Sequence, residues 1–221
     1  MGYHIDFNLI VRSLPVLLRG LVVTVELWVP SIIIGLSLGL ILALGRLSKI
    51  RLLRWATRIY VEIFRDTPVL IQLIWFFFAL PILTGLQLTP FQAALLGLAL
   101  NTSAYASEIY RGGIQSVAKG QWEGAKALGM NHNAAMRRVI LPQVFKRMLP
   151  AFTNRAIEVA KMSSLASVLS VHELMYQGRL LSSTYYRPLE IFTTVAVLYF
   201  ILIYPGSYLS YRLERRLAKP D

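Results

Sequence analysis

Long apolar segments alternate with shorter polar segments along this sequence of 221 residues. A helix that crosses a hydrocarbon core of ~30 Å needs about 20 apolar residues, because each residue adds about 1.5 Å of length. The segments that meet this length cover residues 21–44, 59–83, 91–110, 149–171 and 191–211. No linker long enough to separate domains interrupts them. The pattern predicts an all-α integral membrane protein with five transmembrane helices, organised as a single domain over residues 1–221.

The first apolar segment contains two glycines, Gly35 and Gly39, four residues apart on one helix face. Small residues at this spacing let two helix backbones approach closely inside a membrane. We therefore expect this face to pack against another helix.

Composition supports a membrane protein and argues against several other classes. Hydrophobic residues make up 56% of the chain and charged residues 15%, whereas soluble domains are about 45–50% apolar and about 25% charged. The formal net charge of +12 does not indicate nucleic-acid binding, because the basic residues flank the apolar segments. Cysteine is absent and the three histidines are scattered, so no metal-ligand spacing occurs. We expect no nucleic-acid partner, and neither a metal nor a cofactor bound by this chain.

The distribution of lysine and arginine predicts how the chain is oriented. Five crossings would place 16 basic residues on one side, in residues 46–58, 111–147 and 212–221. They would place 4 on the other side, in residues 1–19, 82–90 and 172–189. Basic residues near the ends of spans accumulate on the cytoplasmic side. We therefore expect an external N-terminus, a cytoplasmic C-terminus and a cytoplasmic loop at about residues 111–147.

This cytoplasmic loop has the pattern of two short helices joined by a turn. The first is predicted over residues 119–128 and is ended by Gly129, since glycine readily adopts the positive φ found after a helix. Asn131 or Asn133 can cap a second helix, which we expect to end at Pro142. Two hinged helices at a membrane surface favour the docking of a partner protein.

The spacing within this loop resembles a family signature. It reads Glu123-Gly124-Ala125, three residues, Gly129, nine residues, Val139, one residue, Leu141-Pro142. This is similar to the pattern E-A-A-x3-G-x9-I-x-L-P, the EAA loop in the membrane subunits of ABC importers. Gly124 stands in place of alanine and Val139 in place of isoleucine. The segments VEIFRDTPVLIQL, SEIYRGGIQSV and KMSSLASVLSV also resemble permeases of polar amino-acid uptake systems, and the resemblance extends from about residue 14 to residue 211.

In that family the loop contacts the cytoplasmic ATPase subunit. The resemblance therefore implies a set of ATPase-coupling residues: Glu123, Gly124, Ala125, Leu128, Gly129, Leu141 and Pro142. It also implies the architecture of a type I ABC importer permease, multi-pass in the bacterial inner membrane, with a periplasmic N-terminus and a cytoplasmic C-terminus.

The implied function is that of the membrane-spanning permease subunit of an ATP-driven importer for polar amino acids. ATPase closure would be coupled to alternating access. The implied partners are an ABC ATPase dimer, a second permease subunit that is identical or homologous, a periplasmic or surface amino-acid-binding protein, and the lipid bilayer. This chain has no G-x4-G-K-[ST] phosphate loop. We therefore expect it not to be an enzyme, with ATP and Mg on the partner ATPase.

Polar side chains inside the predicted spans are candidates for the substrate path. An ionisable group at membrane depth costs about 2.5–3.5 kcal/mol on insertion scales, so its presence favours a functional role. In the third and fourth apolar segments the polar residues recur at helical spacing. The candidates are Arg65, Asp66, Thr67, Asn101, Tyr105, Glu108, Arg155, Glu158, Lys161 and Ser164.

Structural roles compete with this interpretation. Glu62, Arg65 and Asp66 are spaced so that they could neutralise one another on one helix. The polar stripe of the third segment could serve helix packing instead of lining a path. At the inner end of that stripe, Glu108 could pair with Arg111.

In the fourth segment, Arg155, Glu158 and Lys161 share a broad helix face. Pairing of Glu158 with one of the two cations would leave a second positive charge, which suits a substrate carboxylate. Met162 stands where relatives carry an acid or an amide after the lysine, so substrate contacts do not transfer directly.

A different class of function is a self-sufficient proton-coupled secondary transporter or channel, with Glu108 or Glu158 as proton relay. The docking loop and the small number of spans argue against it. An intramembrane enzyme would need a catalytic constellation, and the sequence contains none.

Overall fold

The computed structural model describes residues 4–217, and every regular element among them is helical. The long helices of the bundle are α1 (Phe7–Leu47), α5 (Pro90–Gln115), α8 (Leu141–Met162) and α10 (Pro188–Leu217). The shorter ones are α2 (Arg51–Asp66), α3 (Val69–Ile74), α4 (Leu80–Thr84), α6 (Lys119–Ala127), α7 (His132–Ala135) and α9 (Leu174–Tyr185). Two π-helical segments, η1 (Trp75–Ala79) and η2 (Met136–Ile140), and a 3-10 segment, η3 (Ser163–Leu169), complete them. The predicted all-α class is confirmed.

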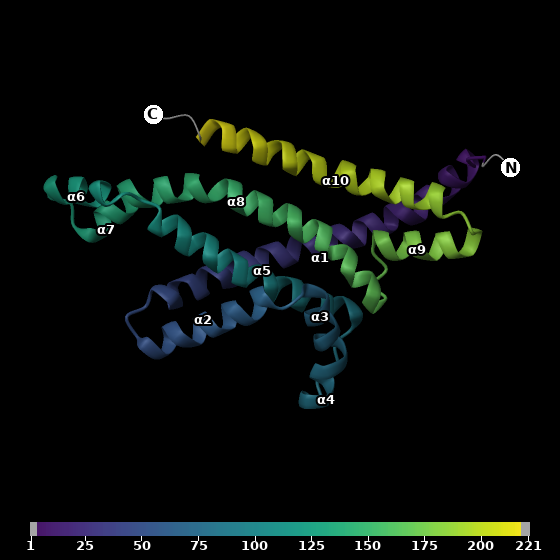
Figure 1. Cartoon of the computed structure of the whole chain (residues 1–221), viewed down its shortest axis with the longest axis horizontal. Coiled ribbons are helices and arrows are strands. Elements are labelled where there is room, and N and C mark those ends of the chain that lie inside the picture. Colours follow the sequence, from purple (N-terminus) through teal and green to yellow (C-terminus); the bar gives the residue numbers. More distant parts are fainter. Residues whose placement is uncertain (1–3, 218–221) are drawn as a thin grey trace.

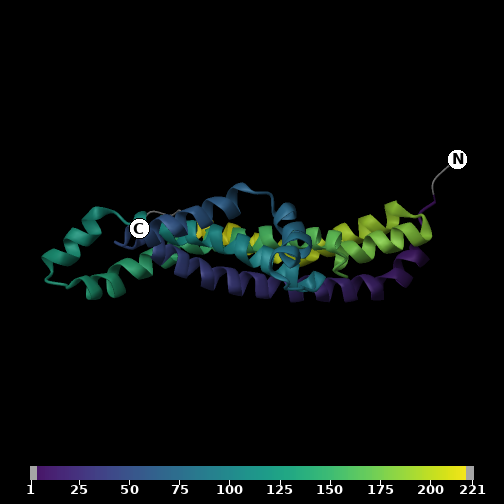
Figure 2. The same ribbon diagram turned by 90° about the horizontal axis from the view of Figure 1, so that it is seen from below.

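The bundle is elongated, and its helices run roughly along its length (Figure 1). The start of α1 and the end of α10 lie at opposite ends of the bundle in both views (Figures 1 and 2). The hairpin of α6 and α7 extends beyond the end at which α10 finishes, while α3 and α4 project from the side.

The second apolar segment is broken. We predicted one helix over residues 59–83, but α2 and the α3–α4 stretch meet at an angle of 107°. Thr67 is extended (φ −103°, ψ 140°), because the ring of Pro68 disfavours helical geometry in the residue before it. The Gln72 amide spans the bend and donates to the carbonyls of Phe64 (2.9 Å) and Thr67 (3.0 Å). These bonds satisfy carbonyl groups that the broken helix leaves open.

Two helices of the described residues are long and apolar enough to cross a bilayer by themselves, α1 and α10. The bent pair formed by residues 51–66 and 69–84 is a third candidate. Helices α5 and α8 contain 26 and 22 residues. Both are long enough to cross a bilayer, but neither is apolar enough to be identified as a span by its composition. The number of five transmembrane helices stays a prediction.

Helix α1 packs closely against α5 through its two glycines. A Cβ on Gly35 would lie 2.5 Å from Cγ2 of Thr102, and one on Gly39 would lie 2.5 Å from Cβ of Ala106. Both separations are far below a van der Waals contact, so no side chain fits at either position. The predicted close helix packing is confirmed.

The fourth apolar segment differs from its prediction at both ends. The second helix of the cytoplasmic loop does not stop at Pro142, because α7, η2 and α8 follow one another without a break from His132 to Met162. In a regular α-helix the ring of Pro142 would clash with the carbonyl four residues earlier. The wider π-helical turn immediately before it gives that ring room. At the other end α8 passes into the 3-10 segment η3.

The apolar core is divided into clusters along the bundle. The central one joins α1, α3, α5 and η3 around Leu27, Leu73 and Leu98, which are fully buried. A second joins the first half of α1 to α9 and α10. The third packs the end of α5 against the start of α8 through Val117, Ile140, Val144 and Met148. This third cluster anchors the base of the cytoplasmic loop.

Candidate functional site

The turn of the cytoplasmic loop has the predicted geometry. Helix α6 ends at Ala127, and Gly129 follows with a φ of +73°. The Gly129 N–H donates to the Lys126 carbonyl at 3.0 Å, and the Met130 N–H donates to the Ala125 carbonyl at 3.1 Å. These bonds close the helix end as in a Schellman-type cap. The predicted helix end at Gly129 is therefore confirmed.

Asn131 begins the second helix of the loop. Its Oδ1 accepts a hydrogen bond from the Ala134 N–H at 2.8 Å. Of the two caps considered from the sequence, Asn131 is thus the one used. The rings of Trp122 and His132 stack across the turn with centroids 5.3 Å apart, so α6 and α7 are held together by side chains as well as by the backbone.

The predicted coupling residues are mostly exposed at this end of the molecule. Ala125 is the buried residue of α6, whereas the other predicted coupling residues are exposed: Glu123, Gly124, Leu128, Gly129, Leu141 and Pro142. Leu128 has an exposed fraction of 78%, which is large for a leucine. A hollow of about 360 Å³ lies beside them, lined by Trp122, Glu123, Lys126, Met130, His132 and Ala135.

Gly124 stands inside α6 where the EAA pattern has alanine, and nothing around it requires glycine. A Cβ at this position would meet no atom within 4 Å. The site accepts glycine or alanine alike.

A buried arginine organises the polar stripe of α5. The Arg155 side chain is only 4% exposed. One of its Nη atoms donates to Asn101 Oδ1 at 2.6 Å and to Thr102 Oγ1 at 3.4 Å. The other Nη pairs with Glu158 at 3.0 Å. The Asn101 amide in turn donates to the Phe64 carbonyl at 2.7 Å. The Asn101 side chain, on α5, therefore connects α2 with α8.

Tyr105 lies between two guanidinium groups. Arg155 is 4.2 Å from the ring centroid and Arg65 is 5.5 Å from it. Cations at these distances are attracted to the face of an aromatic ring. The stack connects the stripe on α5 to both α2 and α8.

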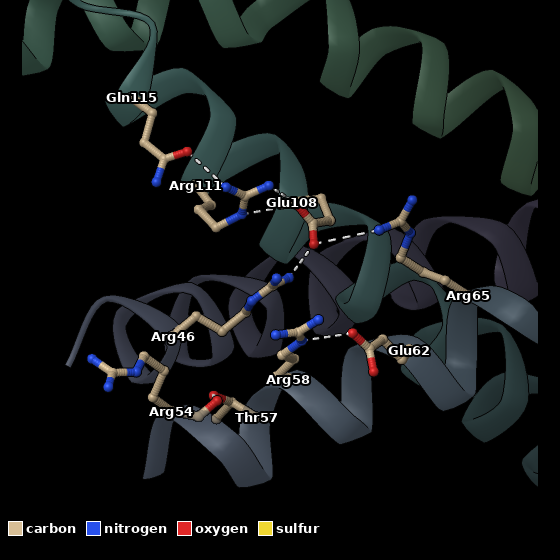
Figure 3. A network of polar contacts seen from close by, with 9 residues as sticks. All are labelled: Arg46, Arg54, Thr57, Arg58, Glu62, Arg65, Glu108, Arg111 and Gln115. Atoms are coloured by element: carbon tan, nitrogen blue, oxygen red, sulfur yellow. Dashed lines mark hydrogen bonds and ion pairs between the residues drawn. The ribbon is translucent and has the colours of Figure 1, made fainter. Parts of the chain in front are cut away.

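Glu108 receives three arginines from three helices. It forms ion pairs with Arg46 at the end of α1, with Arg65 on α2 at 3.3 Å and with Arg111 on α5 at 2.6 Å (Figure 3). The predicted Glu108–Arg111 pair is confirmed. The network fastens α1, α2 and α5 at one end of the bundle.

The alternative in which Glu62, Arg65 and Asp66 neutralise one another is not the arrangement found for Glu62 and Arg65. Glu62 accepts instead from Arg58 at 2.7 Å, one turn earlier on α2. Arg65 reaches Glu108 on the neighbouring helix, as Figure 3 shows. Arg65 thus finds its partner on α5, because α2 packs against that helix, while Glu62 pairs within α2.

The remaining candidates of the substrate path lie in two places. Asp66 and Thr67 are exposed at the bend after α2, and the Thr67 hydroxyl donates to the Ile63 carbonyl at 2.7 Å. Lys161 and Ser164 line a hollow of about 640 Å³ between the end of α8 and α10, together with Tyr199, Tyr204 and other residues of α10. Within residues 4–217, Lys161 has no carboxylate partner. Glu158 is exposed and pairs with Arg155, so one cation is left over as expected.

Sequence analysis did not identify Arg46 or Gln72 as members of the site. Arg46 entered only the count of basic residues, because nothing in its spacing points to Glu108, 62 residues away. Gln72 is a polar residue in an apolar run of a predicted span. This isolated polar side chain is the feature of the sequence that could have identified it. Glu173 was also missed; it is fully buried, caps α9 and accepts a hydrogen bond from the Tyr199 hydroxyl at 2.8 Å.

Residues 35–219 match the family described as binding-protein-dependent transport system inner membrane component. The chain is 36% identical to the arginine transport system permease protein ArtQ of Bacillus subtilis, over 99% of this chain and 100% of that protein. It is 39% identical to the L-cystine transport system permease protein TcyB of the same organism, over 99% and 94%. The glutamate/aspartate import permease protein GltK of Escherichia coli O157:H7 is 34% identical, over 98% and 100%.

Chains of two solved ABC transporter structures have a fold similar to that of this chain. A chain from the crystal structure of an amino acid ABC transporter with histidines superposes with a TM-score of 0.90 and 37% identity, covering 97% of this chain and 100% of that chain. A chain of the inward-facing MetNI methionine ABC transporter superposes with a TM-score of 0.67 and 24% identity, over 96% and 98%. The second likeness concerns the fold alone.

Proposed function

The chain belongs to the family of binding-protein-dependent transport system inner membrane components and is a permease subunit of an amino-acid ABC importer, and we propose that it carries polar amino acids by alternating access. Closure of a partner ATPase dimer would drive the change. ATP and Mg belong to that partner, and this chain binds no cofactor. A second permease subunit and a periplasmic or surface amino-acid-binding protein complete the importer.

The observation that carries the coupling proposal is the path of α8. This helix begins within the cytoplasmic loop, at Leu141, and ends at Met162, beside Lys161. Its first turns pack against α5 through Val144 and Met148, next to Ile140 at the end of η2. A displacement of the loop would therefore be passed along a rigid helix to the hollow between α8 and α10. The exposed residues around Ala125 are the surface on which the ATPase would press.

The proposed membrane topology has five transmembrane helices in the bacterial inner membrane, with the N-terminus in the periplasm and the C-terminus in the cytoplasm. The bent pair of α2 with α3–α4 counts as one span, and α5 and α8 supply two more. Support comes from the opposite positions of the start of α1 and the end of α10 (Figure 1). The strong excess of basic residues in residues 46–58, 111–147 and 212–221 supports the same orientation.

For the substrate path we propose two different roles among the candidates. Lys161, with Ser164, faces the hollow of about 640 Å³, and its positive charge suits the carboxylate of an amino acid. Arg155 and Asn101 are buried and bonded to each other, and they also bond to Glu158 and to the Phe64 carbonyl, so in this conformation they position the helices. The stack of Arg65, Tyr105 and Arg155 would transmit movement between α2, α5 and α8.

A proton-driven transporter is less well supported by the geometry. Glu108 is engaged by three arginines and Glu158 by Arg155. Neither carboxylate is placed as a free proton carrier.

The test is the substitution Gly129→Val in the reconstituted importer. A β-branched residue at a φ of +73° costs about 1–3 kcal/mol and would tilt α6 away from the ATPase. We expect uptake to be lost, with the permease still inserted and the ATPase either detached or unresponsive to the loaded binding protein.

Gly112→Val is the matched control, because a Cβ there also meets open space but the backbone has no positive φ. Normal uptake and normal ATPase stimulation in Gly129→Val would show that this loop is not the coupling element.

A further inference from the structure

A basic pocket lies where the end of α1, the start of α2 and the end of α5 meet. Its volume is about 440 Å³. Among the described residues it is lined by Arg46, Arg51, Arg54, Trp55, Arg58, Glu62 and Arg111. Five guanidinium groups thus face one carboxylate, and we call this hollow the arginine pocket.

The carboxylates nearby do not balance this charge. Arg46 and Arg111 share Glu108 with Arg65 (Figure 3). One carboxylate neutralises at most one of the three. The shared ion pairs also hold Arg46 and Arg111 in place at the wall of the pocket, so their positions are fixed before any ligand arrives.

The arginines at the start of α2 have still fewer partners. Arg58 pairs with Glu62 at 2.7 Å. Within residues 4–217, Arg51 has no carboxylate partner, and the Arg54 guanidinium donates only to the Ser48 carbonyl, at 3.4 Å. Both side chains are exposed. Guanidinium groups bind phosphate oxygens in pairs of parallel hydrogen bonds, so a cluster with free donors suits a phosphate group.

The first turn of α2 adds to this positive field. The helix has 16 residues, its N-cap Ile50 makes no side-chain hydrogen bond, and no acidic residue lies in its first turn. The backbone N–H groups of that turn are therefore open to an anion. They lie next to Arg51 and Arg54, which begin the same helix.

Exposed apolar side chains accompany the arginines at the start of α2, since Trp55 lines the pocket and Ile50 and Leu52 flank Arg51 along the chain, and this selects among phosphate compounds. Ile50, Leu52 and Trp55 have exposed fractions of 63%, 73% and 62%. A soluble phosphate has no apolar groups to pack against such side chains, whereas the acyl chains of a lipid would cover them. A basic cluster beside exposed apolar and tryptophan side chains is the pattern of a helix lying at a membrane interface.

We propose that the arginine pocket binds the phosphate headgroup of an anionic phospholipid in the cytoplasmic leaflet, with its acyl chains along the apolar side of α2. The proposal rests on the proposed topology, which places residues 46–58 on the cytoplasmic side. A bound headgroup would supply the negative charge that Glu108 and Glu62 do not, and would steady the joint between α1, α2 and α5.

The experiment measures lipid binding to the full-length permease, freed of lipid in detergent, by native mass spectrometry. The probes are dioleoylphosphatidylglycerol and dioleoylphosphatidylcholine. Each basic side chain near a membrane surface contributes about 1 kcal/mol to binding anionic lipid, and about 1.4 kcal/mol corresponds to tenfold. We therefore expect R51Q/R54Q to bind phosphatidylglycerol roughly thirtyfold more weakly than the parent, and the parent to prefer phosphatidylglycerol over phosphatidylcholine.

R12Q/R19Q is the matched control. It removes the same charge from exposed arginines near the other end of α1, and it should bind phosphatidylglycerol as the parent does. Equal binding of this lipid by R51Q/R54Q and the parent would contradict the proposal.

Two further measurements separate the other possible occupants. If inorganic phosphate displaces phosphatidylglycerol at similar concentrations, the pocket is a free-anion site and the proposal fails. If R51Q/R54Q keeps its lipid binding but no longer co-purifies with the ATPase, the pocket belongs to a protein interface and the proposal also fails. Failure of the parent to co-purify with any ATPase would count against the proposed function. The lipid measurement would still test the arginine pocket, because it does not involve the ATPase.

Discussion

At the scale of single residues, the most consequential side chain is Arg155. A buried charge is tolerated only when it is paired and hydrogen-bonded, and here Asn101, Thr102, Glu158 and the ring of Tyr105 surround the guanidinium. Asn101 is the nearer of the two neutral acceptors, at 2.6 Å, and it also donates to the Phe64 carbonyl near the end of α2. Its amide is thus fully used within the protein.

We expect Asn101→Leu to destabilise the permease by about 1–3 kcal/mol, because a buried donor on Arg155 would lose its acceptor at 2.6 Å and the Phe64 carbonyl would lose one of its two donors. The measurement is the thermal unfolding midpoint of the detergent-solubilised protein. Asn8→Leu, at an exposed amide on the first turns of α1, is the control and should leave the midpoint nearly unchanged. An unaltered midpoint for Asn101→Leu would mean that the Arg155 network contributes nothing to stability.

At the scale of elements, α1 and α5 are joined by close backbone packing, and the α2–α3 bend is held by one amide. The first contact depends on the absence of side chains at Gly35 and Gly39. The second depends on Gln72, which replaces the bonds that Pro68 cannot make. The close α1–α5 packing fixes the position of α5, which carries Tyr105 and Glu108. The Gln72 bonds fix the bend between α2 and α3.

Gly39→Leu should therefore disturb the joint of α1 and α5. Its Cβ alone would lie 2.5 Å from Ala106 Cβ and 2.9 Å from the Ser103 carbonyl oxygen, and overpacking of this kind costs about 1–3 kcal/mol or more. We expect a lower unfolding midpoint and a reduced yield of folded protein. Ser37→Leu, on the exposed side of the same turn of α1, should behave like the parent. Equal stability of the two variants would exclude a tight α1–α5 contact.

At the scale of the whole molecule, the distribution of charge and the direction of the helices agree. The end of the bundle that carries the α6–α7 loop, which we predict to be cytoplasmic, also receives the end of α10 (Figure 1). The Glu108 network and the arginine pocket lie between this end and the α2–α3 bend. Most of the basic residues thus gather where the ATPase and the inner lipid headgroups would be.

Cysteine labelling tests this orientation directly, since the chain contains no cysteine of its own. In sealed right-side-out vesicles, single cysteines at Gln87 and His4 should react with an impermeant thiol reagent. One at Asn133 should react only after the vesicles are opened. Gln87 and Asn133 are both exposed in the structure, so accessibility within the protein does not decide the result. Labelling of a cysteine at Asn133 from outside the sealed vesicles would contradict the proposed topology.

The sequence by itself determined the features that depend on neighbours along the chain. Apolar periodicity and length predicted the helices, and the small faces of Gly35 and Gly39 predicted close packing. Local backbone chemistry predicted the helix end at Gly129 and allowed the Asn131 cap, because both depend on a few adjacent residues. The spacing around Glu123 resembles the EAA pattern, and the coupling role that it implies stays a prediction.

Only the tertiary structure decided which charged groups meet. Spacing on α2 suggested that Arg65 pairs with Glu62 or Asp66, yet Arg65 reaches Glu108 because α2 lies against α5. Likewise Pro142 lies inside a continuous helical stretch since a π-helical turn precedes it, and Pro68 breaks a span because Gln72 can complete the bend. In each case the outcome depends on a partner or a change of helix type that sequence spacing does not specify.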